Sequence, residues 1–136
     1  GTSTGNLARY YAGDAFYHLG DYERAIEHFQ AFEKAGTYLG ASGYSGLAAS
    51  HAELGNLQEA ARFYEEAARV YENQATTPLY LEKAAQYYEE AGQLQEALSL
   101  YQEIESDFPE SGAAENVAIE IQRLEMKLAG QGGSSS

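Results

Sequence analysis

The residues of this chain that could carry chemistry are three histidines and a large number of carboxylates. His18, His28 and His51 stand at no spacing that would bring two of them to one metal ion. The adjacent glutamates Glu65-Glu66 and Glu89-Glu90 diverge by about 100° on a helix, so neither pair forms a two-carboxylate acid–base site. No glycine-rich phosphate cradle follows a strand, and the serines lack the context of a nucleophile. We therefore predict a protein that is not an enzyme and that holds no metal and no cofactor.

The charge of the chain narrows the class of partner. With 21 acidic and 8 basic residues among 136, the net charge is −13. Nucleic-acid binding needs clustered Lys and Arg, so this balance excludes it, and it disfavours direct binding to anionic membranes. A solvated, highly soluble surface explains the charge, and a preference for cationic or apolar partner segments is the alternative. The absence of cysteine excludes disulfides and thiolate sites.

The apolar runs and the first residues of the sequence bear on the compartment of the protein. The longest apolar runs fall short of the ~18 residues that a membrane span needs, and no secretory leader is visible. The chain begins at Gly1-Thr2-Ser3 without Met. We expect it to be a processed or excised piece of a longer protein, so its compartment stays unknown from these features.

The elements that must position any functional residue follow a repeat. Glycines that end Tyr/Ala-rich stretches recur after 35 and 37 residues, and each is followed by Ala and then, four residues later, by an aromatic side chain. A period near 34 residues with this pattern is typical of a helix-turn-helix solenoid. The three sets are Gly20, Ala25 and Phe29; Gly55, Ala60 and Tyr64; and Gly92, Ala97 and Tyr101.

The repeat predicts an all-α fold of three helix-turn-helix units and a capping helix, in one domain over 1–129. Gly20 supplies a left-handed residue that ends the first helix, and Asp21 is the N-cap of the second. Asn56 with Glu59 three residues later predicts a capping box. Residues 130–136 are expected to be a flexible tail. The units are 6–35, 41–73 and 78–108, with helices at 6–19, 22–34, 41–54, 57–72, 78–91 and 94–105, and the cap at 111–129.

The capping helix has two faces. A stripe of apolar residues would close the open end of the solenoid, as terminal repeats require. Ile119 and Met126 fall on the opposite face, as scattered exposed residues or as a second contact surface. The stripe consists of Ala113, Ala114, Val117, Ile121, Leu124 and Leu128.

The stretch AGDAFYHLGDYERAI, from Ala12 to Ile26, resembles a tetratricopeptide (TPR) repeat. The units around Gly55 and before Pro109 resemble it too, so the likeness covers about 85% of the chain with the cap included. The resemblance implies a right-handed solenoid in which the first helix of each pair lines a concave groove that binds a polypeptide. Phe32 and Ile104 depart from it, because the family's second helix usually has a small residue there.

Residues at groove-facing positions of the resemblance are Tyr10, Asp14 and Tyr17 in the first unit and Glu82, Gln86 and Glu89 in the third, with small residues of the second unit between them. A clamp for a partner's terminal carboxylates needs cationic donors, and these positions hold none. The lining instead predicts an aromatic wall, a small-residue floor and an acidic rim that bind a polypeptide segment. In the alternative interpretation, the tyrosines only pack between helices.

A second likeness concerns the pathway. The segment Thr76-Thr77-Pro78-Leu79-Tyr80, with 101–111, is similar to TPR domains of membrane-anchored bacterial envelope proteins, such as the ancillary subunit of the secretion translocon. It implies a domain on the periplasmic side of a membrane, in protein transport or assembly. Two other hypotheses are self-assembly through Ile119, Met126 and the first helix, and a regulatory domain from an enzyme that lies upstream.

Overall fold

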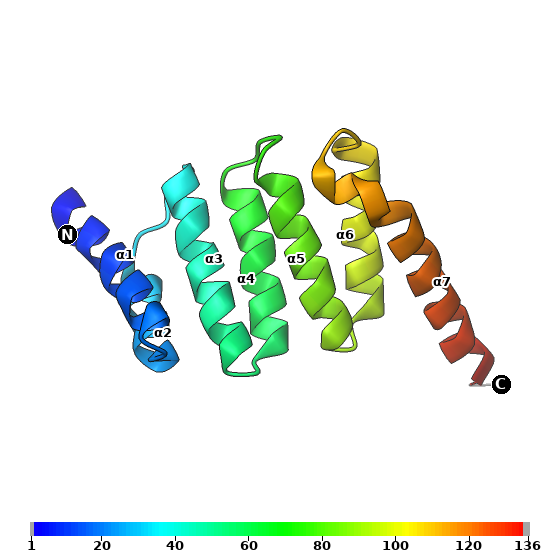
Figure 1. The fold of residues 1–136 in the computed structure, drawn as a ribbon, viewed down its shortest axis with the longest axis horizontal. Coiled ribbons are helices and arrows are strands. Elements are labelled where there is room, and N and C mark those ends of the chain that lie inside the picture. The colour runs from blue at the N-terminus through cyan, green and yellow to red at the C-terminus, as the bar shows by residue number, and fades with distance from the viewer. Residues whose placement is uncertain (1, 135–136) are drawn as a thin grey trace.

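The helices stand side by side in chain order, so the two ends of the chain lie at opposite ends of the molecule (Figure 1). The structure is a computed structural model that describes residues 2–134. Helices packed against their sequence neighbours confirm the predicted all-α solenoid. The elements of the described part are α1 (Ser3–His18), α2 (Tyr22–Ala31), α3 (Tyr38–Glu53), α4 (Leu57–Val70), α5 (Thr77–Glu90), α6 (Leu94–Asp107), the 3₁₀ turn η1 (Gly112–Asn116) and α7 (Val117–Ser134).

In each of the three helix pairs, a turn of the same geometry joins the two helices. Gly20, Gly55 and Gly92 have φ of +80°, +81° and +83°, in the left-handed region where a side chain would be strained. After the first of them, the Asp21 N–H returns to the carbonyl oxygen of Phe16 at 2.9 Å, which satisfies a free carbonyl at the end of the helix. The predicted role of Gly20 is therefore confirmed, and the three pairs turn alike.

Phe29 of α2 packs against the backbone of both neighbouring helices. A Cβ atom on Gly13 of α1 would lie 2.8 Å from its ring, and one on Gly46 of α3 would lie 2.5 Å away. Phe32 approaches Gly43 in the same way, at 2.6 Å. Gly43 and Gly46 of α3 thus lie where large rings approach the helix backbone, which offsets their low helix propensity.

The core continues from α3 to the C-terminal helix. Val117 and Leu124 of α7 are buried, and the other members of the predicted stripe pack half-buried against the same cluster. The cluster includes large side chains from α5 and α6 such as Leu81 and Ile104. The predicted capping stripe is therefore confirmed. At the other end, α1 buries just one residue, Gly13, among those described.

Several predicted boundaries are corrected. The cap does not begin as one helix at 111, because a 3₁₀ turn precedes α7, and α7 continues to Ser134 where a flexible tail from 130 was predicted. Glycine lowers helix propensity by about 1 kcal/mol but keeps its N–H donor, so it does not by itself end a helix. Residues 135 and 136 of the predicted tail lie outside the described part. Helix α2 ends at Ala31, since Phe32 has an extended backbone (φ −69°, ψ 126°).

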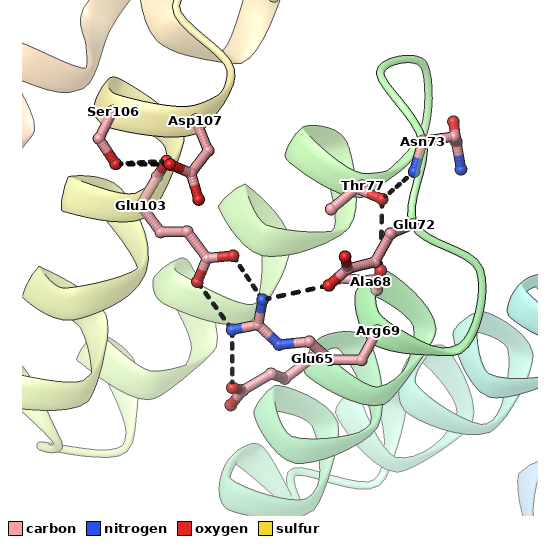
Figure 2. A network of polar contacts seen from close by, with 9 residues as sticks. All are labelled: Glu65, Ala68, Arg69, Glu72, Asn73, Thr77, Glu103, Ser106 and Asp107. Carbon is pink, nitrogen blue, oxygen red and sulfur yellow. Dashed lines mark hydrogen bonds and ion pairs between the residues drawn. The ribbon is translucent and has the colours of Figure 1, made fainter.

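The second helices of units two and three are tied together by Arg69 (Figure 2). Its guanidinium on α4 donates to both carboxylate oxygens of Glu103 on α6, one of them at 2.8 Å. It also donates to Glu65 at 3.3 Å and lies 4.0 Å from Glu72. Tyr88 of α5 donates to the second oxygen of Glu65 at 2.8 Å, so the network links three helices.

The turn between α4 and α5 is held by a buried hydroxyl (Figure 2). Thr77 Oγ1 accepts from the Asn73 N–H at 2.9 Å and donates to the Ala68 carbonyl at 3.3 Å. Pro78 follows in the first turn of α5, where the missing N–H has no helical partner to lose. The Thr-Pro step therefore has a structural role in this turn.

Candidate functional site

A first pocket of about 250 Å³ lies between α1 and α3. Its walls are aromatic on the side of α1 and α2 and small on the side of α3. Tyr10, Asp14 and Tyr17, which the sequence analysis assigned to the groove, are among the residues of this lining. The lining residues are Tyr10, Asp14, Tyr17, His18, Phe29, Ser42, Ser45, Gly46 and Ala49.

The tyrosines of the first pocket both pack between helices and face the pocket. The ring of Tyr10 lies edge-on to Phe29, with centroids 5.9 Å apart, and burial raises the pKa of its hydroxyl. Burial and then the carboxylate of Glu53 raise the pKa of Tyr17. The two hydroxyls therefore stay neutral near pH 7 and present rings with a polar tip.

Asp14 supplies the carboxylate among the residues that line the first pocket. Its Oδ1 lies 3.5 Å from Nδ1 of His18, and that nitrogen is also 2.8 Å from the Asp14 main-chain oxygen. Both side chains are more than half exposed, so water reaches them. The lining contains no Lys and no Arg.

A second pocket of about 500 Å³ lies between α5 and α7 and is strongly charged. It contains all three predicted groove residues of the third unit. Its lining residues are Glu82, Gln86, Glu89, Glu90, Tyr101, Asn116, Glu120, Arg123 and Lys127.

Glu89 fastens α7 to α5 from inside this second pocket. Arg123 Nη2 donates to its Oε1 at 2.7 Å, Nη1 donates to its Oε2, and Lys127 Nζ lies 2.7 Å from Oε2. These bonds, the one from Arg123 first, lower the pKa of Glu89 to about 2. Arg123 also donates to Glu120 on its own helix, at 3.2 Å from Nε. The carboxylate of Glu89 is therefore bound within the chain.

Glu82 and Gln86, in contrast to Glu89, are not held by Arg123 or Lys127 in the described part of the chain. Gln86 is exposed, and Glu82 is half-buried, which raises the pKa of its carboxyl. Glu82 also lines a third pocket of about 350 Å³, whose walls include Leu79 and Ala113. It lies at the junction of a charged pocket and a more apolar one.

The first and second pockets occupy equivalent positions in different repeats. The residues of α1 and α2 that line the first pocket have counterparts in α5 and α6 that line the second, always 72 residues later (82 minus 10, for example). The same number separates the turn glycines Gly20 and Gly92. The pairs are Tyr10 with Glu82, Asp14 with Gln86, Tyr17 with Glu89, His18 with Glu90, and Phe29 with Tyr101.

The opposite walls correspond as well. Ser42, Gly46 and Ala49 of α3 are each 74 residues before Asn116, Glu120 and Arg123 of α7 (123 minus 49, for example). The guanidinium that crosses the second pocket therefore comes from the position where the first pocket has the methyl group of Ala49. Because the residues at equivalent positions differ, an ion pair crosses the second pocket and none crosses the first.

Two aromatic side chains that the sequence analysis did not assign to the groove stack on each other and line neither pocket. Tyr64 of α4 stacks on Tyr87 of α5, with ring centroids 5.6 Å apart and planes 9° apart. The ammonium of Lys83 lies 5.8 Å from the centre of the Tyr64 ring, and burial raises the pKa of Tyr64 to about 12. Tyr64 was assigned to the repeat pattern, but the pattern gave no sign of its stacking partner.

The six predicted groove residues thus fall into two separate pockets rather than one. Ile119 and Met126 lie outside both, with 64% and 68% of their surfaces exposed, as their helix face predicted. His51 stacks on Phe63, and burial lowers its pKa. Within residues 2–134 no cluster of three His, Cys, Asp or Glu side chains could hold a metal ion. Over the same part of the chain, no helix has the length and apolar character to cross a membrane.

Comparison with known proteins gives the family. Two profiles of the tetratricopeptide repeat family match the chain, over residues 40–107 and over residues 7–35. The N-terminal domain of stress-induced protein-1 (STI-1) from C. elegans is similar in structure, with a TM-score of 0.71 and 18% identity. That alignment covers 92% of this chain and 99% of the STI-1 chain. No curated protein matches the sequence. The repeats, their turns and these profiles agree, and the chain belongs to the tetratricopeptide repeat family.

Proposed function

We propose that this domain binds a polypeptide segment in its concave groove and that the first pocket receives the principal side chain of the segment. TPR domains generally mediate protein–protein interactions and are typically not catalytic. The observation that carries the proposal is that an ion pair between Glu89 and Arg123 crosses the second pocket, whereas the equivalent first pocket has no Lys or Arg in its lining.

The chemistry of the first pocket supports this function. Tyr10, Tyr17 and the ring of Phe29 offer apolar surface, and the tyrosine hydroxyls add hydrogen bonds. The small side chains of Ser45 and Ala49 leave space for a partner group against α3. A segment bound there would extend along α5 past Glu82 and Gln86, which are not tied up in ion pairs with basic side chains in the described part. In this proposal Glu89 contributes mainly by holding the wall in place.

The test is capture from the source organism's extract with three proteins: the parent domain, Tyr17→Ala and Glu82→Lys. Both variants are expected to keep the fold, as circular dichroism would show, since neither Tyr17 nor Glu82 is fully buried. A protein held by the parent is expected to be lost from both variants. Fragments of that protein are then titrated against the domain, and each variant is expected to weaken binding about tenfold or more. Equal capture and equal affinity would overturn groove recognition.

A matched control separates the groove from the net charge. Glu66→Lys makes the same two-unit change of charge as Glu82→Lys, at an exposed position of α4 that lines neither pocket. This variant is expected to bind the captured fragment like the parent domain. A loss of binding equal to that of Glu82→Lys would assign the effect to long-range charge rather than to contact.

A second candidate function is self-assembly through α7, favoured by the exposure of Ile119 and Met126 on one side of that helix. It predicts that light scattering finds a dimer at high protein concentration and that Ile119→Lys restores the monomer. A clean monomer at high concentration counts against it. We also propose a role in bacterial envelope transport or assembly. The identity of the captured protein tests this proposal.

A further inference from the structure

We propose that the first pocket accepts the guanidinium of an arginine from the bound polypeptide, held against Tyr10 and Tyr17 and paired with Asp14. This inference rests on the proposed function, because it names the side chain that the groove recognises. It follows from comparing the two equivalent pockets of one molecule.

In the second pocket, an arginine of the chain itself occupies the position that we propose for the ligand. There the guanidinium of Arg123 enters from α7 and bonds to Glu89 on the facing helix, 34 residues earlier. In the first pocket Ala49 takes the position of Arg123 and Tyr17 takes that of Glu89. Helix α3 therefore provides no cation, and the carboxylate of the lining comes from Asp14, three residues before Tyr17. The space between α1 and α3 is left open for a group that comes from outside the chain.

The walls of the first pocket suit a planar cation. Asp14 presents a carboxylate, and Glu53 is near enough to raise the pKa of Tyr17. The faces of aromatic rings attract a cation within about 6 Å of their centres. The lining groups that could compete for Asp14 are the imidazole of His18 and the neutral hydroxyls of serine and tyrosine. With no Lys or Arg in the lining, the carboxylate has no permanent cationic partner there.

The size and shape of the pocket favour arginine over lysine. One water molecule needs roughly 10–15 Å³ measured in this way, so about 250 Å³ admits a long side chain. A guanidinium stacks on tyrosine rings and donates two parallel hydrogen bonds to a carboxylate, whereas an ammonium is a more strongly hydrated point charge. Contacts with both the rings and Asp14 need the planar group.

The experiment selects ligands without assuming a sequence. A random 12-residue peptide library displayed on phage is selected on the parent domain, with counter-selection on Tyr17→Ala. We expect the enriched peptides to share an arginine. Each is then synthesised with arginine or with citrulline, which keeps the shape and loses the charge. Fluorescence anisotropy is expected to show a loss of affinity of tenfold or more for citrulline, and a similar loss for Asp14→Asn with the arginine peptide.

Two outcomes would contradict the proposals, and they can be told apart. If groove-dependent peptides are enriched but lack arginine, or bind equally with citrulline, the arginine inference is overturned and the proposed function stands. If no peptide distinguishes the parent domain from Tyr17→Ala, the proposed groove function fails and this inference fails with it.

A gain-of-charge variant tests the comparison of the pockets directly. Ala49→Arg places a guanidinium where α7 has Arg123, and it is expected to abolish binding of the arginine peptide while the fold is retained. Gln58→Arg adds the same charge on exposed α4 and is expected to change affinity less than threefold. Equal binding by Ala49→Arg and the parent domain would contradict the proposed position of the ligand.

Discussion

Glu89 and Arg123 stand 34 residues apart and form a two-point ion pair between α5 and α7, and Arg69 and Glu103 do the same between α4 and α6 at the same separation. The Arg69 pair joins the second helices of units two and three, and the Glu89 pair joins the first helix of unit three to the capping helix. The two bridges lie on different layers of the solenoid, one on the first helices of the units and one on the second. Unit three is therefore fastened to unit two on one layer and to the capping helix on the other.

Replacing Glu89 is expected to loosen α7. Glu89→Gln removes the negative charge that receives both Arg123 and Lys127, and we expect a loss of about 1–3 kcal/mol in the free energy of unfolding. Guanidinium denaturation measures it. Glu90→Gln is the matched control, because Glu90 is exposed and makes no ion pair in the described part. An equal effect of both substitutions would show that total charge, not the bridge, is responsible.

The same bridge predicts a pH dependence. The pKa of Glu89 falls from 4.5 to about 2 in the folded state, so its contribution is fully present above pH 4.5 and is lost as pH falls toward 2. The shift corresponds to at most about 3 kcal/mol, and less because Arg123 and Lys127 are partly exposed. Unfolding at pH 5 and at pH 2.5 is compared for the parent and for Glu89→Gln. The parent should lose more stability, and parallel losses would refute the assignment.

Gly46→Ala is expected to destabilise the N-terminal half. The new Cβ would lie 2.5 Å from the buried ring of Phe29, and overpacking of this kind costs about 1–3 kcal/mol, more than alanine gains as a helix former. Thermal unfolding measures the change. Gly112→Ala meets no atom within 4 Å and serves as the control. Adding Phe29→Leu to Gly46→Ala should recover part of the loss, and no recovery would argue against the ring as the cause.

Arg69→Lys is expected to lower stability by about 1 kcal/mol or less, since the guanidinium is about one-third exposed. Lysine keeps the charge but cannot donate two parallel bonds to Glu103. A double-mutant cycle with Glu103→Gln, at low and at 1 M salt, isolates the pair. A coupling free energy near zero at both salt concentrations would mean that the bridge adds nothing to stability.

Local features of the fold were predictable because their causes lie within a few residues. Gly20 ends α1 for reasons of backbone conformation, and Asp21 caps α2 by accepting from the Arg24 N–H at 3.3 Å. The predicted capping box at Asn56 is wrong, since that side chain makes no capping bond. Its amide nitrogen instead lies 3.2 Å from Nδ1 of His51, a contact across the turn that local sequence rules do not include.

The candidate site was predictable only in part, because it depends on how helices face one another. Tyr10, Asp14 and Tyr17 were assigned from one unit, and the structure brings them to one pocket. Glu89 was assigned in the same way, but its binding to Arg123 depends on the register of α7 against α5. A search for opposite charges separated by one repeat length could have found that pair.

The single buried residue of α1 has a consequence for kinetics. Gly13 gives this helix little anchorage, whereas α5 and α6 are embedded in the larger core. Opening of the N-terminal end therefore requires less free energy than opening of the rest. Because α1 forms one wall of the first pocket, a segment bound there as proposed would leave by local fraying of this helix, without passage through a rigid opening. Residence time would then respond to substitutions that secure α1, even where those substitutions never touch the ligand.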